Sequence, residues 1–141
     1  MVKKKKMKLG TKIAIGFGVV AAGLGALLYY LSTRARGEEI VVGKTYYFDY
    51  IPGVLNVRNF VTGANFPYST ASEVVASIEG GTGIGTGSGS TKITSVNVWD
   101  PGAQNWFAWG YSGGKWRGTN SVISPGDGLI IFYISSFSWT P

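Results

Sequence analysis

The feature that most constrains this chain is an uncharged run, IAIGFGVVAAGLGALLYYL, at positions 13–31. As an α-helix with a rise of 1.5 Å per residue, this run would span about 28 Å, which matches the hydrocarbon core of a bilayer. A removable signal peptide is the alternative, but its apolar core is shorter, and Thr33-Arg34-Ala35 is a poor cleavage site. The run therefore predicts one uncleaved transmembrane helix, with Tyr29 and Tyr30 at the outer membrane interface.

The charges that flank the span predict its orientation. Six lysines lie in residues 1–12, whereas the juxtamembrane linker, residues 32–38, has two arginines and a glutamate. The positive-inside rule then places the basic tail in the cytoplasm or particle interior and residues 39–141 outside. An outer domain without cysteine fits a prokaryotic or viral envelope better than a eukaryotic secreted protein, which disulfides commonly stabilise.

Small residues form one stripe along the predicted membrane helix. Ala14, Gly18, Ala22 and Ala26 recur every four residues. Such a stripe lets two helices approach closely, so another copy of this chain is one expected partner within the bilayer. The alternative is that the stripe only reflects the frequency of glycine and alanine in membrane helices.

The net charge of +6 does not indicate a nucleic-acid-binding protein. Residues 1–36 hold eight basic residues and no acid, whereas residues 37–141 hold five basic and seven acidic residues, a balance of −2. A nucleic-acid-binding domain needs its positive charge on the folded part of the chain. Because the chain has no cysteine and no histidine, we also expect no metal site and no cofactor.

Residues 39–141 have the pattern of an all-β domain, an antiparallel sandwich or small barrel with one short helix. Runs rich in β-branched and aromatic residues alternate with Pro-Gly, Thr-Gly and Gly-Gly turns. Pro52-Gly53 and Pro101-Gly102 are expected to close hairpins. The predicted strands lie near residues 40–42, 45–50, 54–60, 92–99, 106–111 and 129–134, with a further candidate at 121–123.

One helix and one glycine-rich loop interrupt these strands. Thr70 and Glu73 match a capping box, and the apolar residues that follow predict a two-turn helix ending at Gly80. Residues 80–90, GGTGIGTGSGS, have little to bury and predict a flexible surface loop. A phosphate-binding loop is a weak alternative, because here a helix precedes the glycines and a strand follows them.

Nothing in the sequence assembles a catalytic site. Asp100 and Asp127 adjoin Pro-Gly turns, where a short carboxylate commonly accepts hydrogen bonds from backbone amides. The serines have no histidine to activate them, and no Ser-x-x-Lys motif is present. We therefore expect a protein that is not an enzyme.

The strongest candidate for a binding surface is aromatic. Along residues 106–111, Trp106 should lie on one face of a strand, and Phe107, Trp109 and Tyr111 on the other. A two-layer domain cannot bury both faces unless something covers the second, so one face is lidded by the glycine loop or carboxy-terminal tail, docked on a protein, or used to hold a glycan. The candidate interface residues are Trp106, Phe107, Trp109, Tyr111 and Trp116.

Three stretches, at 57–78, 93–109 and 123–132, carry a resemblance to a known family. The first, VNVRNFVTGANFPYSTASEVVASI, reads as a strand, a loop and a short helix, and the second, ITSVNVWDPGAQNWFAW, as two strands around a tryptophan-aspartate turn. The third, ISPGDGLIIF, is a Pro-Gly-x-Gly type of turn before an apolar strand. This order resembles a β-rich module repeated in prokaryotic cell-surface and surface-layer proteins. The resemblance implies a surface or assembly module and assigns no functional residue.

Together these observations predict a single-pass, membrane-anchored surface protein with a structural or attachment role. Its expected partners are the lipid bilayer and other envelope or capsid proteins of a prokaryotic cell or a membrane-containing virion. One alternative is a glycan-binding module that uses Trp106, Trp109 and Trp116. Another is a pilin-like filament subunit cleaved after Lys8-Leu9-Gly10, although Lys12 directly after the cut argues against it.

Overall fold

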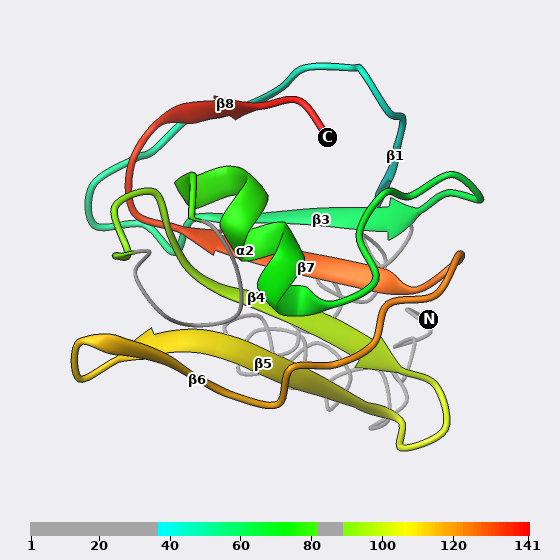
Figure 1. Ribbon diagram of the computed structural model, residues 1–141. Helices are drawn as coiled ribbons and strands as arrows, with labels where there is room; N and C mark the ends of the chain where they lie inside the picture. The colour runs from blue at the N-terminus through cyan, green and yellow to red at the C-terminus, as the bar shows by residue number, and fades with distance from the viewer. Residues whose placement is uncertain (1–36, 82–88) are drawn as a thin grey trace, which may run out of the picture. The chain divides into compact units, whose positions relative to one another are not determined.

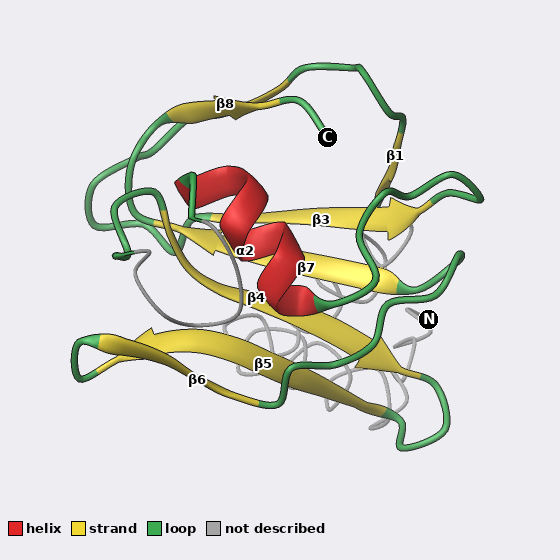
Figure 2. Cartoon of the chain, viewed as in Figure 1, coloured by secondary structure: helices red, strands yellow, loops and turns green. Residues whose placement is uncertain are grey.

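The computed structural model describes residues 37–81 and 89–141, and these residues form a β-rich domain with one short helix, as predicted (Figures 1 and 2). The elements are β1 (Glu38–Ile40), β2 (Tyr46–Phe48), β3 (Val57–Thr62), α2 (Ala71–Glu79), β4 (Ile93–Asp100), β5 (Asn105–Ser112), β6 (Lys115–Gly118), β7 (Gly128–Tyr133) and β8 (Phe137–Trp139).

The parts of the chain that carry the membrane prediction lie outside these residues. They are the basic tail 1–12, the predicted span 13–31 and its stripe of Ala14, Gly18, Ala22 and Ala26; residues 82–88 of the glycine loop lie outside as well. Within residues 37–81 and 89–141, no helix is long and apolar enough to cross a membrane.

Six strands form the larger sheet in the order β1-β3-β7-β4-β5-β6, and β2 and β8 pair as a separate two-stranded ribbon. Neighbouring strands are antiparallel except β1, which runs parallel to β3, so the prediction of purely antiparallel pairing is wrong at this edge. We call the end of the larger sheet where β3 begins and β7 finishes the near end, and the opposite end the far end; they lie left and right in Figure 1.

One predicted hairpin is confirmed and the other is wrong. Pro101-Gly102 joins β4 to β5, where Trp99 pairs with Trp106. Pro52-Gly53 does not pair β2 with β3, because β2 pairs with β8 while β3 lies between β1 and β7.

The second hairpin fails because β2 belongs to a different layer. Tyr46 and Phe48 of β2 are each 1% exposed, and both rings pack on Phe60 of β3, at centroid distances of 5.3 and 6.0 Å. Stacking the ribbon on the sheet packs these rings against the sheet's own side chains. Pairing edge to edge would have left one face of β2 without that cover.

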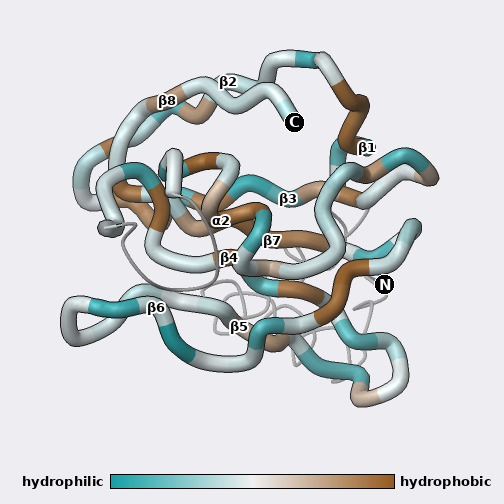
Figure 3. The backbone as a smooth tube through the Cα atoms, viewed as in Figure 1, coloured by the Kyte–Doolittle hydropathy of each residue, from teal (hydrophilic) through white to brown (hydrophobic). Residues whose placement is uncertain are grey.

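The helix and the ribbon cover one face of the larger sheet, which we call the core face (Figure 1). β7, brown in Figure 3, supplies Leu129 and Ile131 to this core, both 0% exposed. Trp139 of β8 links the layers, because its ring lies 6.0 Å from Phe60 and its Nε1 donates to Ser77 Oγ of α2 at 2.9 Å. We call the opposite face of the larger sheet the outer face.

The helix forms as its sequence predicts. The Thr70 hydroxyl accepts a hydrogen bond from the Glu73 amide, and the Glu73 carboxylate accepts from the Thr70 amide, which completes the capping box. Gly80 ends the helix in the left-handed conformation, with φ of 81°. The predicted apolar face is buried and consists of Ala71, Val74, Val75 and Ile78.

A β-bulge at the start of β4 decides which of its residues reach the core. Ile93 pairs with Tyr133, but the register shifts before Ser95. The extra residue, Thr94, lets Ile93 and Val96 face the core together, although they are three positions apart, and both are 0% exposed.

Two short strands were not predicted, and one predicted strand is reduced to a bridge. β6 (KWRG) and β8 (FSW) alternate between polar and apolar residues, but four and three residues are too few for this alternation to indicate a strand. Residues 121–123 contribute only an isolated bridge between Val122 and Thr70.

Candidate functional site

The predicted interface residues divide between the two faces of the larger sheet, as alternation required. Trp106 lies on the outer face opposite Trp99, whereas Phe107 and Trp109 lie opposite Val98 and Val96 on the core face. The trio proposed to hold a glycan, Trp106, Trp109 and Trp116, therefore does not form one coplanar platform.

Trp116 is the most buried of the candidates, although it lies on an edge strand. It pairs with Tyr111 across β5 and β6, is 5% exposed, and its ring lies edge-on to Tyr111 at 5.4 Å. Trp109 packs against the same core, and its buried Nε1 has no hydrogen-bond partner within residues 37–81 and 89–141. This arrangement favours a packing role for these two tryptophans over a docking role.

Residues 119–123 pack on the core face near these two tryptophans. The sequence had instead predicted a lid made by the glycine loop or the carboxy-terminal tail. The Ser121 carbonyl accepts from the Ala71 amide at 3.1 Å, and the Ile123 amide donates to the Ser69 carbonyl at 2.8 Å. Residues 119–123 are thereby fastened to the start of α2. The carboxy-terminal tail instead pairs with β2 over the β3 side of the sheet.

On the outer face, Trp99 and Trp106 form a tilted pair with ring centroids 5.3 Å apart. The Trp106 ring reaches over Gly128 of β7, where an added Cβ would lie 3.3 Å from a ring carbon. A larger residue at position 128 would therefore push this ring out of place.

The far end of the sheet carries an open cleft with a volume of about 670 Å³. It brings together residues from the end of β4, the start of β5 and the segment 119–127, and one of them, Phe107, belongs to the predicted interface. The lining residues are Val98, Trp99, Asp100, Pro101, Phe107, Thr119, Ser121, Val122, Ser124 and Asp127.

The two carboxylates of the cleft also hold its turns, as the sequence predicted. Asp100 Oδ1 accepts from the amides of Gly102 and Ala103 at 2.8 and 3.0 Å, and Asp127 Oδ2 accepts from the Ser124 amide at 2.7 Å. Among the described residues, no basic side chain lines the cleft. Its ionisable groups are thus both acidic, which suits a neutral or cationic ligand better than an anionic one.

A buried hydroxyl fixes the turn that forms one side of the cleft. Thr62, 2% exposed at the end of β3, donates from Oγ1 to the Ser124 carbonyl at 2.7 Å, and its backbone carbonyl accepts from the Gly126 amide at 2.7 Å. These bonds fix the turn that carries Asp127, so the lining does not depend on a ligand for its shape.

The near end carries exposed apolar side chains on two adjacent loops, and we call this group the apolar tip. Asn56, only 7% exposed, shapes it: its Oδ1 accepts from the Ile51 amide, and its Nδ2 donates to the carbonyls of Ile51 and Val54. The members of the tip are Tyr50, Ile51, Val54, Leu55 and Ile134.

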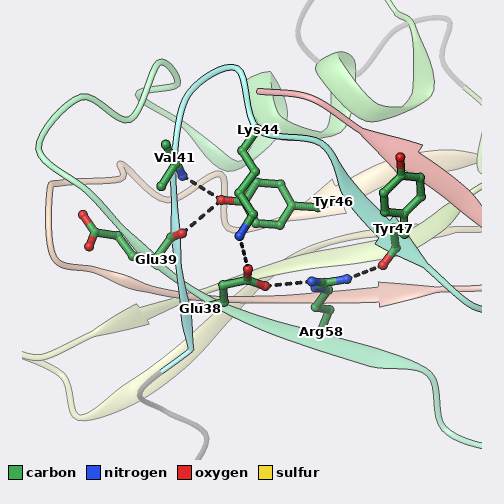
Figure 4. Close-up of polar contacts among 7 residues, drawn as sticks. All are labelled: Glu38, Glu39, Val41, Lys44, Tyr46, Tyr47 and Arg58. Atoms are coloured by element: carbon green, nitrogen blue, oxygen red, sulfur yellow. Dashed lines mark hydrogen bonds and ion pairs between the residues drawn. The ribbon is translucent and has the colours of Figure 1, made fainter.

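The first strand is tied to the domain by a charged cluster (Figure 4). The Glu38 carboxylate forms ion pairs with Lys44 and with Arg58, the latter at 2.7 Å. The Lys44 ammonium and, next, the Arg58 guanidinium hold the pKa of Glu38 below its usual range, and Glu38 in turn raises the pKa of Lys44. Arg58 also donates to the Tyr47 carbonyl, so the cluster joins β1, β2 and β3.

Tyr46 reinforces the same junction from within the core. Its hydroxyl accepts from the Val41 amide at 2.7 Å and donates to the Glu39 carbonyl at 3.0 Å (Figure 4). At Gly37, an added Cβ would lie 2.5 Å from the Phe60 amide nitrogen. The position at which the chain enters the domain therefore requires glycine and is held by backbone pairing, ion pairs and a buried phenol.

The described polar groups are arranged to hold loops and strands together. No three acidic side chains in residues 37–81 and 89–141 are close enough to share a metal ion. Within the described part of the chain, the cleft and the apolar tip are two surfaces whose composition suits binding, and neither was predicted as a unit. The cleft draws on separate parts of the sequence, whereas the uncharged run at residues 50–57 was a usable signal for the tip.

The chain matches no protein-family model, no curated protein and no solved structure. The resemblance to cell-surface repeats therefore stays a prediction, and the candidate sites rest on the geometry of the described domain alone.

Proposed function

We propose that this protein is a non-enzymatic, membrane-anchored surface protein that attaches to a neighbouring envelope or capsid protein through the far-end cleft. In this proposal, residues 13–31 span the membrane, the basic tail stays inside, and the β-rich domain lies outside. The attachment is structural, and no covalent chemistry is assigned to it.

The observation that carries the proposal is the cleft itself. It is pre-formed by the Thr62 hydrogen bonds and is lined by apolar, hydroxyl and carboxylate groups. At its rim, Val122 is 72% exposed, the highest exposed fraction among the large apolar side chains of the described residues. An apolar side chain beside fixed polar groups is a common composition for a protein-binding site.

The use of the acidic side chains also supports binding over catalysis. Asp100 and Asp127 each accept backbone hydrogen bonds that define a turn, and Glu79 does the same at the end of α2. Their hydrogen bonds hold the backbone in place, which is a structural use of a carboxylate.

A glycan-binding module is the second candidate, and the same cleft favours it. Phe107 contributes aromatic surface there, beside the hydroxyls of Thr119 and Ser121. Pyranose rings are commonly held by such a combination of aromatic and hydrogen-bonding groups. This candidate now rests on different residues from the tryptophan trio expected from the sequence.

The test compares two exposed valines in envelopes or particles that contain the full chain. Val122→Asp adds a third negative charge at the cleft, whereas Val42→Asp, at an exposed position that does not line the cleft, serves as the matched control. After the membrane is dissolved with a non-ionic detergent, we expect the Val122 variant to be lost from the assembled protein fraction and the Val42 variant to be retained. Equal retention of two folded variants would contradict attachment through the cleft.

Two further measurements separate the alternatives. Binding on a glycan array that disappears with Val122→Asp, without any effect on assembly, would favour the glycan-binding module. Amino-terminal sequencing of the mature protein that begins at Thr11 would favour the pilin-like subunit, whereas our proposal expects Met1 or Val2.

A further inference from the structure

We propose that the partner in the far-end cleft is a second copy of this chain, which inserts the hairpin that joins its β5 and β6. The inference rests on the proposed function, because it names the occupant of the same cleft. We call residues 112–117, SGGKWR, the cationic hairpin. Four observations lead to this pairing.

The first observation is that the hairpin carries the positive charges that the domain itself does not use. Of the five basic residues at positions 37–141, three form an ion pair with Glu38 or donate to a backbone carbonyl. The other two, Lys115 and Arg117, are exposed and form no ion pair with any acid of residues 37–81 and 89–141. They alternate with the buried Trp116, so both side chains lie on the same side of β6. The hairpin therefore presents two neighbouring cations that can pair with acids elsewhere.

The second observation is the shape of the hairpin. Ser112 pairs with Lys115, and only Gly113 and Gly114 lie between them, with φ of 59° and 80°. A positive φ at both positions is typical of the two-residue turn whose twist matches that of the flanking strands. The pairing of β5 with β4 ends at Gly110, so the hairpin extends past the neighbouring strand. Its tip is narrow because two glycines form it, and strand pairing holds it in shape before it enters a cleft.

The third observation is the charge of the cleft. Asp100 Oδ1 and Asp127 Oδ2 accept the backbone amides that define the turns, which leaves Asp100 Oδ2 and Asp127 Oδ1 without a hydrogen-bond partner among the described residues. Lysine and arginine form strong, charge-assisted hydrogen bonds with carboxylates, and their aliphatic stems pack on apolar surface such as Val98 and Phe107. The two cations of the hairpin thus match the two acids of the cleft in number and in sign.

The fourth observation is that the hairpin and the cleft lie at opposite ends of one sheet (Figure 1). β5 begins at the far end, beside the cleft, and finishes at the near end, where the hairpin turns. Its eight residues span about 25 Å, so the hairpin cannot enter the cleft of its own chain. A contact between unlike surfaces of two copies repeats from copy to copy and builds rings or filaments, which suits a structural role in an envelope.

The test uses the absence of cysteine from the chain. A full chain with Ser112→Cys is mixed with a differently tagged full chain with Val122→Cys in a mild non-ionic detergent, and a short bis-maleimide is added. In the matched control, Val42→Cys replaces Val122→Cys, because Val42 is exposed and does not line the cleft. We expect the hairpin–cleft product to exceed the control product by about ten-fold or more, because the contact holds the two thiols at high effective concentration.

Charge reversal then identifies the groups in contact. Lys115→Glu together with Arg117→Glu, in the copy that supplies the hairpin, should lower the hairpin–cleft product by about five-fold or more, because like charges then meet. Thr119→Lys, in the copy that supplies the cleft, should restore the product with this reversed hairpin. Thr119 is suitable because it is exposed and lines the cleft, whereas both aspartates hold turns.

A hairpin–cleft product no larger than the control product would overturn the pairing, and so would a product that charge reversal leaves unchanged. If Val122→Asp still releases the protein from the assembled fraction in such a case, attachment through the cleft stands and its partner is a different protein. If Val122→Asp has no effect either, the proposed function fails together with the pairing.

Discussion

Removing the carboxylate of Glu79 should destabilise the domain far more than truncation of a half-exposed side chain at a helix end normally does. Glu79 is the last residue of α2, where the helix dipole disfavours a negative charge. Its carboxylate nevertheless accepts from the amides of Thr91, Lys92 and Ile93, at distances from 2.7 to 3.2 Å, and from the Thr91 hydroxyl at 2.7 Å. One side chain therefore joins α2 to the start of β4.

The magnitude follows from the burial of the donors. Ile93 has no exposed surface, so without Glu79 its amide becomes a buried, unpaired donor, which costs about 1–3 kcal/mol, and the lost bonds to Thr91 and Lys92 add about 1 kcal/mol. We expect Glu79→Ala to lower the free energy of unfolding by about 2–4 kcal/mol, and Glu79→Gln, which keeps one acceptor oxygen, by roughly half as much.

The assay is a urea titration of the full chain in a mild detergent, followed by tryptophan fluorescence. Glu39→Ala is the matched control, because Glu39 is an exposed acid whose side chain forms no ion pair among the described residues, and it should change the unfolding free energy by less than about 0.5 kcal/mol. A loss for Glu79→Ala no larger than that of the control would refute the reasoning.

Three further predictions use the same titration. Shortening residues 81–89 to four glycines and serines should change the unfolding free energy by less than about 1 kcal/mol, because loop closure entropy depends weakly on length; a loss of several kcal/mol would show that the loop is packed. Trp109→Ala, in the core, should cost roughly 3 kcal/mol and clearly more than Trp106→Ala on the outer face, and equal costs would contradict this assignment. Because the pKa of Glu38 is lowered in the folded protein, its stabilising effect is present above pH 4.5 and is lost as the pH falls through the folded pKa; Glu38→Gln should remove this acid-sensitive part, up to about 1 kcal/mol, whereas Glu39→Gln should leave it unchanged.

Short sequence motifs correctly predicted the helix and the hairpin whose structure depends only on neighbouring residues. The capping box located the start of α2, Gly80 located its end, and Pro101-Gly102 located the hairpin between β4 and β5. Each of these signals depends on hydrogen bonds or backbone angles within a few residues, which the sequence displays directly.

Long-range pairing was not predictable from the same signals. Pro52-Gly53 does form a turn, yet β2 pairs with β8 because its rings fit against Phe60 in the second layer. The parallel pairing of β1 with β3 likewise depends on a close approach at Gly37, which no local pattern reveals.

The candidate sites were likewise predictable where they depend on local alternation and unpredictable where they depend on long-range pairing. Alternation correctly separated Trp106 from Phe107 and Trp109, but it could not tell which face would be covered. The cleft joins residues 98–107 to residues 119–127, and Asp100 and Asp127 meet there only because β4 lies between β5 and β7.

Protease protection of the full chain in intact cells or sealed particles tests the central claim most directly. An epitope on residues 1–8 and trypsin sites at Arg34, Arg36 and Lys44 lie on opposite sides of the predicted span. We expect added trypsin to release the β-rich domain while the epitope stays protected, until detergent opens the membrane. Loss of the epitope with a protected domain, or release of both without detergent, would contradict a chain anchored with its amino terminus inside and its β-rich domain outside.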